Sequence, residues 1–255
     1  MELSYLLSAL ETVCPLKLSY DCIEQGGYDN SGLLVKTHQS VNKILFSLDF
    51  SAMVVQKAIS VGADTVITHH PAIYHPIKTV GVAENDAIAL AVKNDLNVIS
   101  MHLNLDIASN GIDDCLAYGL GGVTLTPLNL GFVGYGKEFL IEKTTLNCYA
   151  EKVAKTFGTQ KLLVYGNPET VIEKVASFCG AGGSEGATYN GNANLIVTSD
   201  LAHHEIKEII EKGKNLIILP HYVAENYGFT KFYNKVTKLI GNEVKTEIFV
   251  DERFI

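Results

Sequence analysis

This chain of 255 residues is poor in basic residues. Only 20 Lys and Arg stand against 28 Asp and Glu, which gives a formal net charge of -8, and no basic run exceeds what a solvated helix face carries. This balance argues against a nucleic-acid partner and against attraction to an anionic lipid surface. A small anionic substrate is still compatible, because bound metal ions invert the local charge.

Paired cysteines and a serine-hydrolase motif are also absent. The five cysteines are odd in number and contain no C-x-x-C pair, which indicates buried or free thiols in a reducing cytoplasm. No G-x-S-x-G elbow occurs. We therefore expect a cytoplasmic protein and find no motif for a serine nucleophile.

No segment has the pattern of a membrane span or a signal peptide. Residues 116–136 are uncharged, but they contain Pro127 and six glycines that would break a helix repeatedly. This stretch is predicted to be a linker or a domain-crossing loop. Residues 1–18 lack a basic start and have apolar residues at helical spacing, so an amphipathic helix is predicted there. We expect no membrane partner.

Strand and helix patterns alternate through most of the chain, which predicts an α/β fold. The predicted strands cover residues 43–48, 64–68, 97–101, 195–198 and 215–219. Helices are predicted over residues 51–61, 83–94 and between Asp200, the candidate N-cap, and Gly213. The segment 245–254 has strand composition and is predicted to return to the first half of the fold.

Similar spacings in the two halves indicate an internal duplication. Asp49 precedes Gly62 by thirteen residues, as Asp200 precedes Gly213, and a histidine follows each aspartate after twenty or twenty-one residues. Two related α/β lobes facing each other across a dinuclear metal cleft are therefore predicted. The alternative is that any β-α-β unit gives such spacings. We predict a first lobe over residues 1–125, completed by residues 240–255, and a second lobe over 126–239.

Three clusters of histidine and carboxylate follow predicted strands, where α/β sheets usually carry their sites. They are His69-His70 before Pro71, His102 with Asp106, and His221 with Glu225. Imidazole and carboxylate without thiolate suit Zn, Mn, Fe or Co. Together the clusters predict a two-metal site. Taken alone, each cluster has another explanation. His69 and His70 could be surface histidines, His221 and Glu225 a chance pair at a helix start, and His102 and Asp106 ordinary loop residues.

The geometry expected of these clusters differs from one to the next. A turn at Pro71 would let His69 and His70 converge, although neighbours in an extended chain point apart. His221 and Glu225 are four residues apart, so a helix starting there places both on one face. The stretch around His102 and Asp106 has loop composition.

Three weaker signals have competing explanations. The Gly-rich stretch 180–186 could cradle an anion or make a tight turn, and it lacks both nucleotide-binding fingerprints. His203 and His204 fall in the first turn of a predicted helix, where they could face a cleft or solvent. His75 is a candidate second-layer or substrate-contacting group.

These residues resemble a known family. Tyr28-Asp29-Asn30-Ser31-Gly32, Thr68-His69-His70-Pro71, His102-x-Asn104-x-Asp106 and His221-Tyr222-x-x-Glu225 occur in the order of the GTP cyclohydrolase I type 2 homologues, also called NIF-three-like proteins. The family usually has Trp at the position of Tyr28. The resemblance implies two divalent metal ions per chain, bound by His69, His70, Asp106, His221 and Glu225, with Glu225 bridging. It also implies a homohexamer of two-lobed protomers.

The leading functional hypothesis is a metal-dependent hydrolase of a small molecule, with a purine nucleotide such as GTP as the candidate. His102 or His204 would move the proton in that reaction. Whether His102 ligates a metal directly is left open by the resemblance. The alternatives are a non-catalytic metal-handling or cofactor-assembly protein, and a regulatory module whose site is a relic.

Overall fold

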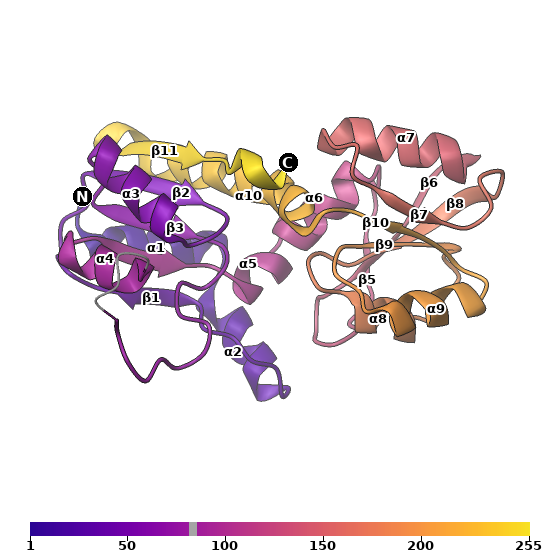
Figure 1. Cartoon of the computed structure of the whole chain (residues 1–255), viewed down its shortest axis with the longest axis horizontal. Coiled ribbons are helices and arrows are strands. Elements are labelled where there is room, and N and C mark those ends of the chain that lie inside the picture. The colour runs from indigo at the N-terminus through magenta and orange to yellow at the C-terminus, as the bar shows by residue number, and fades with distance from the viewer. Residues whose placement is uncertain (82–85) are drawn as a thin grey trace. The chain divides into compact units, whose positions relative to one another are not determined.

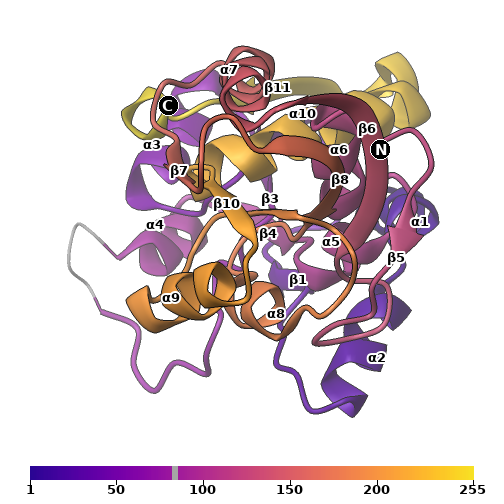
Figure 2. The same cartoon turned by 90° about the vertical axis from the view of Figure 1, so that its right-hand side faces the viewer.

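The computed structural model describes residues 1–81 and 86–255. Within them the chain forms two compact units, one made of residues 1–108 and 229–250 and the other of residues 109–228 and 251–255. Each unit contains one sheet with helices packed on it (Figure 1, Figure 2). The predicted α/β class is confirmed.

The first unit is built on a five-stranded sheet in the order β1-β4-β3-β2-β11. Neighbouring strands run parallel except for β1, which is antiparallel to β4. The strands are β1 (Gly32–Val35), β2 (Lys43–Ser47), β3 (Thr65–Thr68), β4 (Asn97–Ser100) and β11 (Lys245–Phe249). The strands predicted over 43–48, 64–68 and 97–101 are confirmed as β2, β3 and β4.

The central strands of this sheet are covered on both faces, which explains their unbroken apolar sequence. Every residue of β3 and β4 is buried. Leu45 and Val66 pack in one cluster with Val55 of a helix. Phe46, which points to the other face, contacts Phe229. The strand ends, by contrast, open into the loops that carry the histidines.

One helix of the first unit, α3, begins and ends where the sequence predicts. Helix α3 starts after Ser51, whose side chain accepts a hydrogen bond from the Val54 amide, and it ends at Gly62, whose φ of 69° is easiest for glycine. The helix predicted over 83–94 is observed as α4, and residues 83–85 lie outside the described residues. The helices are α1 (Leu3–Val13), α2 (Leu16–Glu24), α3 (Ala52–Val61), α4 (Ala87–Lys93) and α5 (Leu103–Ile107).

The amphipathic helix predicted at the N-terminus is confirmed as α1. Its residues Leu3, Leu6, Leu10 and Val13 are buried, and they recur at the three- and four-residue spacing of one helix face. Among the helices in residues 1–81 and 86–255, none is both long and apolar enough to cross a membrane.

The second unit has a six-stranded mixed sheet in the order β5-β6-β8-β9-β10-β7, in which β8, β9 and β10 are parallel. Helix α7 lies on one side of it, and α8 and α9 lie on the other (Figure 1, Figure 2). The strands are β5 (Thr126–Pro127), β6 (Lys137–Thr145), β7 (Leu163–Tyr165), β8 (Val171–Ser177), β9 (Leu195–Thr198) and β10 (Asn215–Ile218). The helices are α6 (Ile112–Gly119), α7 (Leu146–Phe157), α8 (Gly183–Thr188) and α9 (His203–Glu211).

The compact units have different bounds from the predicted lobes. Residues 109–125 belong with the second sheet, because α6 packs on β6 and β8. The last long helix, α10 (His221–Ile240), is divided between the units: its residues 221–228 belong to the second, and Phe229 onward to the first. β11 pairs with β2 in parallel, as predicted for the C-terminal segment. Short 3-10 turns, Gly241–Glu243 and Glu252–Phe254, flank that strand.

Cysteine burial leads to a first testable prediction. Cys148 is exposed, whereas the other four cysteines are buried. Burial raises the pKa of Cys14 to about 12 and that of Cys22 to about 11, which keeps both as unreactive thiols. Titration of the native protein with a chromogenic disulfide at pH 8 should show one fast thiol per chain. A fast phase that persists in Cys148→Ser would contradict this assignment.

Candidate metal centre

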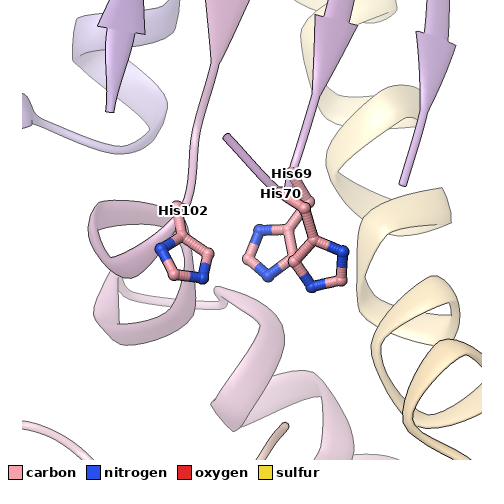
Figure 3. A group of neighbouring side chains, drawn as sticks. All are labelled: His69, His70 and His102. Carbon is pink, nitrogen blue, oxygen red and sulfur yellow. The ribbon is translucent and has the colours of Figure 1, made fainter. Parts of the chain in front are cut away.

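Three histidines from two loops converge at the carboxyl ends of β3 and β4. His69 and His70 follow β3 directly, and His102 follows β4 after one residue. One ring nitrogen from each lies within 4.8 Å of those of the other two. Figure 3 shows the His69 and His70 rings close together, with the His102 ring beside them. We call these three residues the histidine group.

A sharp turn of the backbone allows two sequence neighbours to share one site. The amides of His69 and His70 both donate to the carbonyl of Leu48, at 3.1 and 3.0 Å. This double contact bends the chain before Pro71, and the two ring centroids come within 4.8 Å. The convergence predicted for this pair is observed. His69 is fully buried, and His70 and His102 are partly exposed.

Each ring of the histidine group has its Nδ1 held by a protein oxygen. A neutral imidazole that donates from Nδ1 presents a lone pair on Nε2, and this arrangement orients metal-binding histidines in many proteins. The three contacts are His69 Nδ1 to Met101 O at 2.8 Å, His70 Nδ1 to Asp49 Oδ1 at 2.6 Å and His102 Nδ1 to Asp29 Oδ1 at 2.7 Å.

Asp29 is a buried carboxylate that serves His102. Its Oδ2 accepts hydrogen bonds from Ser19 and Ser31, and the Ser31 hydroxyl in turn accepts from the His102 amide at 3.0 Å. Burial opposes the charged form, but the hydrogen bonds from His102 and the two serines outweigh it and lower the pKa of Asp29. The Asp29 carboxylate is therefore charged at neutral pH and fixes the His102 ring.

Asp106 lies beside the histidine group. Its Oδ1 is 3.5 Å from His69 Nε2, and the side chain is nearly fully buried. The loop predicted here is wrong for residues 103–107, which form the short helix α5, and right for residues 108–111. The Asp106 amide donates to the His102 carbonyl and closes the first turn of α5. The reason is tertiary, since Asn104 is buried and donates to the carbonyl of Cys14 at 2.7 Å.

His221 and Glu225 form a second group in the other unit. Both lie in the first turns of α10, and His221 Nε2 is 2.9 Å from Glu225 Oε2, as the four-residue spacing predicts. His221 Nδ1 is 2.7 Å from Asp200 Oδ2, so this ring is oriented by a carboxylate as well. The N-cap role predicted for Asp200 is wrong, because α9 begins after Ala202.

The Gly-rich stretch lies against the second group. A Cβ built on Gly180 would lie 2.5 Å from Glu225 Oε1 and 3.5 Å from His221 Nε2, and the backbone there has a φ of 59°. Glycine at this position leaves room for the Glu225 carboxylate. That gives the stretch a role in shaping the second group. The anion cradle stays a prediction.

The other candidate histidines, His203, His204 and His102, differ in their surroundings. His203 and His204 are exposed in the first turn of α9, which matches the solvent-facing alternative. His102, predicted as a proton carrier, lies in the histidine group, where a ring nitrogen could also ligate a metal.

The donor atoms fit a divalent ion. The two groups contain imidazole nitrogens and carboxylate oxygens, and no thiolate is among them. This is the chemistry of borderline divalent ions such as Zn, Mn, Fe or Co. Acidic partners on His70, His102 and His221 add negative charge, which would further favour a cation.

Comparison with known proteins identifies the family. The family model described as Duf34/NIF3 (NGG1p interacting factor 3) matches residues 1–253. The chain belongs to this family. The resemblance noted in the sequence is thus confirmed.

Relatives from distant organisms cover the chain from end to end. A protein of Clostridium perfringens named GTP cyclohydrolase 1 type 2 homolog is 28% identical over 96% of this chain and 95% of its own length. A protein of the same name from Methanocaldococcus jannaschii is 29% identical over 96% of this chain and 98% of its own. A solved structure, the Bacillus cereus protein related to NIF3, has a TM-score of 0.86 at 19% identity, covering 99% of this chain and 97% of that one. This last likeness supports the Duf34/NIF3 fold.

Sequence reasoning missed the carboxylates that hold the histidines. Asp29 is 73 residues from His102, and no periodicity links such distant positions. Asp49 was noted only for its position in the repeat, and Asp200 for its position in the repeat and as a candidate N-cap. A sharper signal was available: each lies 21 residues before the histidine that it contacts, His70 and His221.

Proposed function

We propose that this protein is a divalent-metal-dependent hydrolase of a small molecule, with a purine nucleotide such as GTP as the candidate substrate. The observation that carries the proposal is that His69, His70, His102 and His221 each hold Nδ1 against a protein oxygen. A histidine that only fills space does not need this arrangement, whereas a metal ligand does. The name of the two relatives, GTP cyclohydrolase 1 type 2 homolog, supplies the candidate substrate.

The proposed ligands come from both groups. As the family resemblance implies, His69 and His70 of the histidine group, the neighbouring Asp106, and His221 and Glu225 of the second group would hold two divalent ions per chain. When bound, such ions polarise a substrate oxygen and make water acidic enough to attack near neutral pH. The Asp49 and Asp200 carboxylates hold Nδ1 of His70 and His221, which orients each ring and leaves its Nε2 for the metal. Gly180 leaves Glu225 free of a clashing side chain.

Proton movement is proposed for His102 or His204. The contact between His102 and Asp29 stabilises a proton on Nδ1, so the ring could exchange its other proton with substrate. His204 is exposed and has no such partner carboxylate in the described residues, which makes it the weaker candidate of the two.

Product analysis tests the proposal directly. Protein reconstituted with Zn, Mn, Fe or Co is incubated with GTP and a nucleotide panel, and products are identified by mass spectrometry. We expect turnover by the wild type and a loss of about 100-fold or more in Glu225→Ala, since a carboxylate that would hold the metal would be missing. Glu243→Ala, which removes an exposed carboxylate from a 3-10 turn, is the matched control and should retain activity.

Metal content measured on the same samples separates the competing functions. Two ions per chain with no turnover of any nucleotide would reject the nucleotide hydrolase. That result would favour the metal-handling alternative, which predicts readily exchanged metal.

A further inference from the structure

Three exposed aromatic side chains pack together next to the histidine group. They are Tyr28, Tyr74 and His75, which we call the aromatic cluster. The Tyr28 and Tyr74 ring centroids are 5.1 Å apart, and the His75 ring is 5.0 Å from Tyr28 and 4.7 Å from Tyr74. Yet Tyr28 and Tyr74 keep exposed fractions of 43% and 41%. Rings that contact each other but stay open to solvent leave faces and edges available for a ligand.

Hydrogen bonds hold the aromatic cluster in place from both sides. The Tyr28 hydroxyl donates to the Tyr74 carbonyl at 2.7 Å, and the Asn30 side chain donates to the Ile73 carbonyl at 2.5 Å. The loop after Pro71 is thereby fastened to the segment 28–30. Because the loop is already held in place, a ligand that bound to these rings would cost little conformational entropy of the loop.

The aromatic cluster is continuous with the histidine group. The Tyr74 and His102 ring centroids are 5.9 Å apart, with the rings at 87°. Tyr28 is the sequence neighbour of Asp29, which holds His102. A molecule lying on the cluster would therefore have its nearest edge beside His102, within reach of groups held at His69 and His70.

We propose that Tyr28, Tyr74 and His75 form a stacking subsite for a planar nitrogen heterocycle, such as the purine base of a nucleotide, beside the histidine group. This inference rests on the proposed function in one respect: the histidine group is taken as the reaction centre. The binding itself is claimed independently of turnover.

The chemistry of the cluster selects this kind of occupant. Aromatic faces bind flat heterocycles of many kinds, because every base has a π-face. The two hydroxyls and the His75 nitrogens add donors and acceptors around the rings, which suits a heterocycle with polar edges. Three side chains are too few for a stable protein interface, which buries roughly 800 Å² on each partner.

The test exploits the absence of tryptophan from this chain. A Tyr74→Trp variant has a single indole reporter in the cluster, and guanosine, which lacks phosphate, is the probe. We expect saturable quenching of the indole by guanosine. Ribose 5-phosphate, which has no aromatic ring, should give none. No quenching by guanosine up to its solubility limit would overturn the subsite.

Substitutions in the otherwise native chain measure what the rings contribute. Guanosine binding, followed by saturation-transfer NMR, should weaken about 5- to 150-fold in Tyr74→Leu and in Tyr28→Leu. Tyr28→Phe keeps the ring and removes only its hydroxyl, so it should bind guanosine within about threefold of wild type. Tyr20→Leu, which removes an exposed tyrosine from α2, is the folding and surface control.

Metal loading on the same variants excludes a purely supporting role. The leucine variants should bind metal as the wild type does. If metal binding and guanosine binding fall by the same factor, the rings support His102 and the subsite is rejected. Wild-type affinity for guanosine in both leucine variants would also reject it.

The two proposals can fail separately. Ring-dependent guanosine binding without turnover leaves the subsite standing and rejects the hydrolase. Turnover of a nucleotide with an unchanged KM in Tyr74→Leu leaves the hydrolase standing and rejects the subsite.

Discussion

Asp49→Ala should weaken the binding of a divalent ion by about 10- to 100-fold, the usual effect of removing a group that orients a metal-binding histidine. The Asp49 carboxylate accepts from His70 Nδ1 at 2.6 Å, so its removal frees the ring to rotate and to change tautomer. It also removes a negative charge near the cation. Because the Asp49 side chain is 41% exposed, folding should be little affected. Competition with a chromogenic chelator at fixed pH measures the affinity.

Three further variants make this result specific. Asp200→Ala should have an effect of similar size, because Asp200 contacts His221 Nδ1 at 2.7 Å in the same way. Asp49→Asn keeps an acceptor for the Nδ1 proton and should recover part of the loss. Glu24→Ala removes one exposed negative charge from α2 and serves as the charge control. Equal metal affinity in Asp49→Ala and Glu24→Ala would rule out an orienting role for Asp49.

The two aspartates also bear on the history of the fold. In the first unit Asp49 lies between β2 and α3, and in the second Asp200 lies between β9 and α9. The strands on either side of each helix, β2 with β3 and β9 with β10, pair in parallel. Each helix is followed by a glycine with a φ near 70°, which is 69° at Gly62 and 72° at Gly213. Each aspartate contacts a histidine 21 residues later. These matched features support the internal duplication, which stays an interpretation.

The parallel strands were predictable from sequence because they are buried on both faces. β3, β4 and β9 are buried at every residue, and such strands are read as short apolar runs between turns. The edge strands of the second sheet, β5 and β7, gave no such signal. β5 has two exposed residues, and β7 has three that are at most partly buried, so their place in the sheet is decided by pairing partners alone.

The ligand candidates were predictable for a different reason. His69, His70 and His102 follow β3 and β4, whose carboxyl ends share an edge of one sheet, so the strand pattern itself brings these three together. His221 follows β10 of the other sheet in the same way. The short helix at Leu103–Ile107 and the contact from Asp29 depend on distant parts of the chain. Local composition therefore predicted a loop where the short helix lies, and it gave no sign of the contact between Asp29 and His102.

The largest effect on stability is expected at a buried ion pair in the second unit. Asp113→Ala should lower the free energy of unfolding by about 3–5 kcal/mol, because it leaves the Lys137 ammonium without its nearest carboxylate. Asp113 is fully buried; its Oδ2 lies 2.8 Å from Lys137 Nζ, and its Oδ1 accepts from the Cys179 amide at 3.2 Å. Burial alone would lower the pKa of Lys137, but the facing carboxylates of Asp113 and Asp114 raise it. Urea unfolding followed by circular dichroism measures the loss.

A double-mutant cycle shows whether the loss belongs to the pair. Asp113→Leu combined with Lys137→Met replaces both charges by apolar groups, and such exchanges cost far less than removing one partner. We therefore expect the double variant to be more stable than either single one. Glu173→Ala breaks the exposed pair with Lys143 and should cost no more than about 1 kcal/mol. Strictly additive losses in the cycle would mean that Asp113 and Lys137 stabilise the second unit independently, through the Cys179 amide and the Gly134 carbonyl.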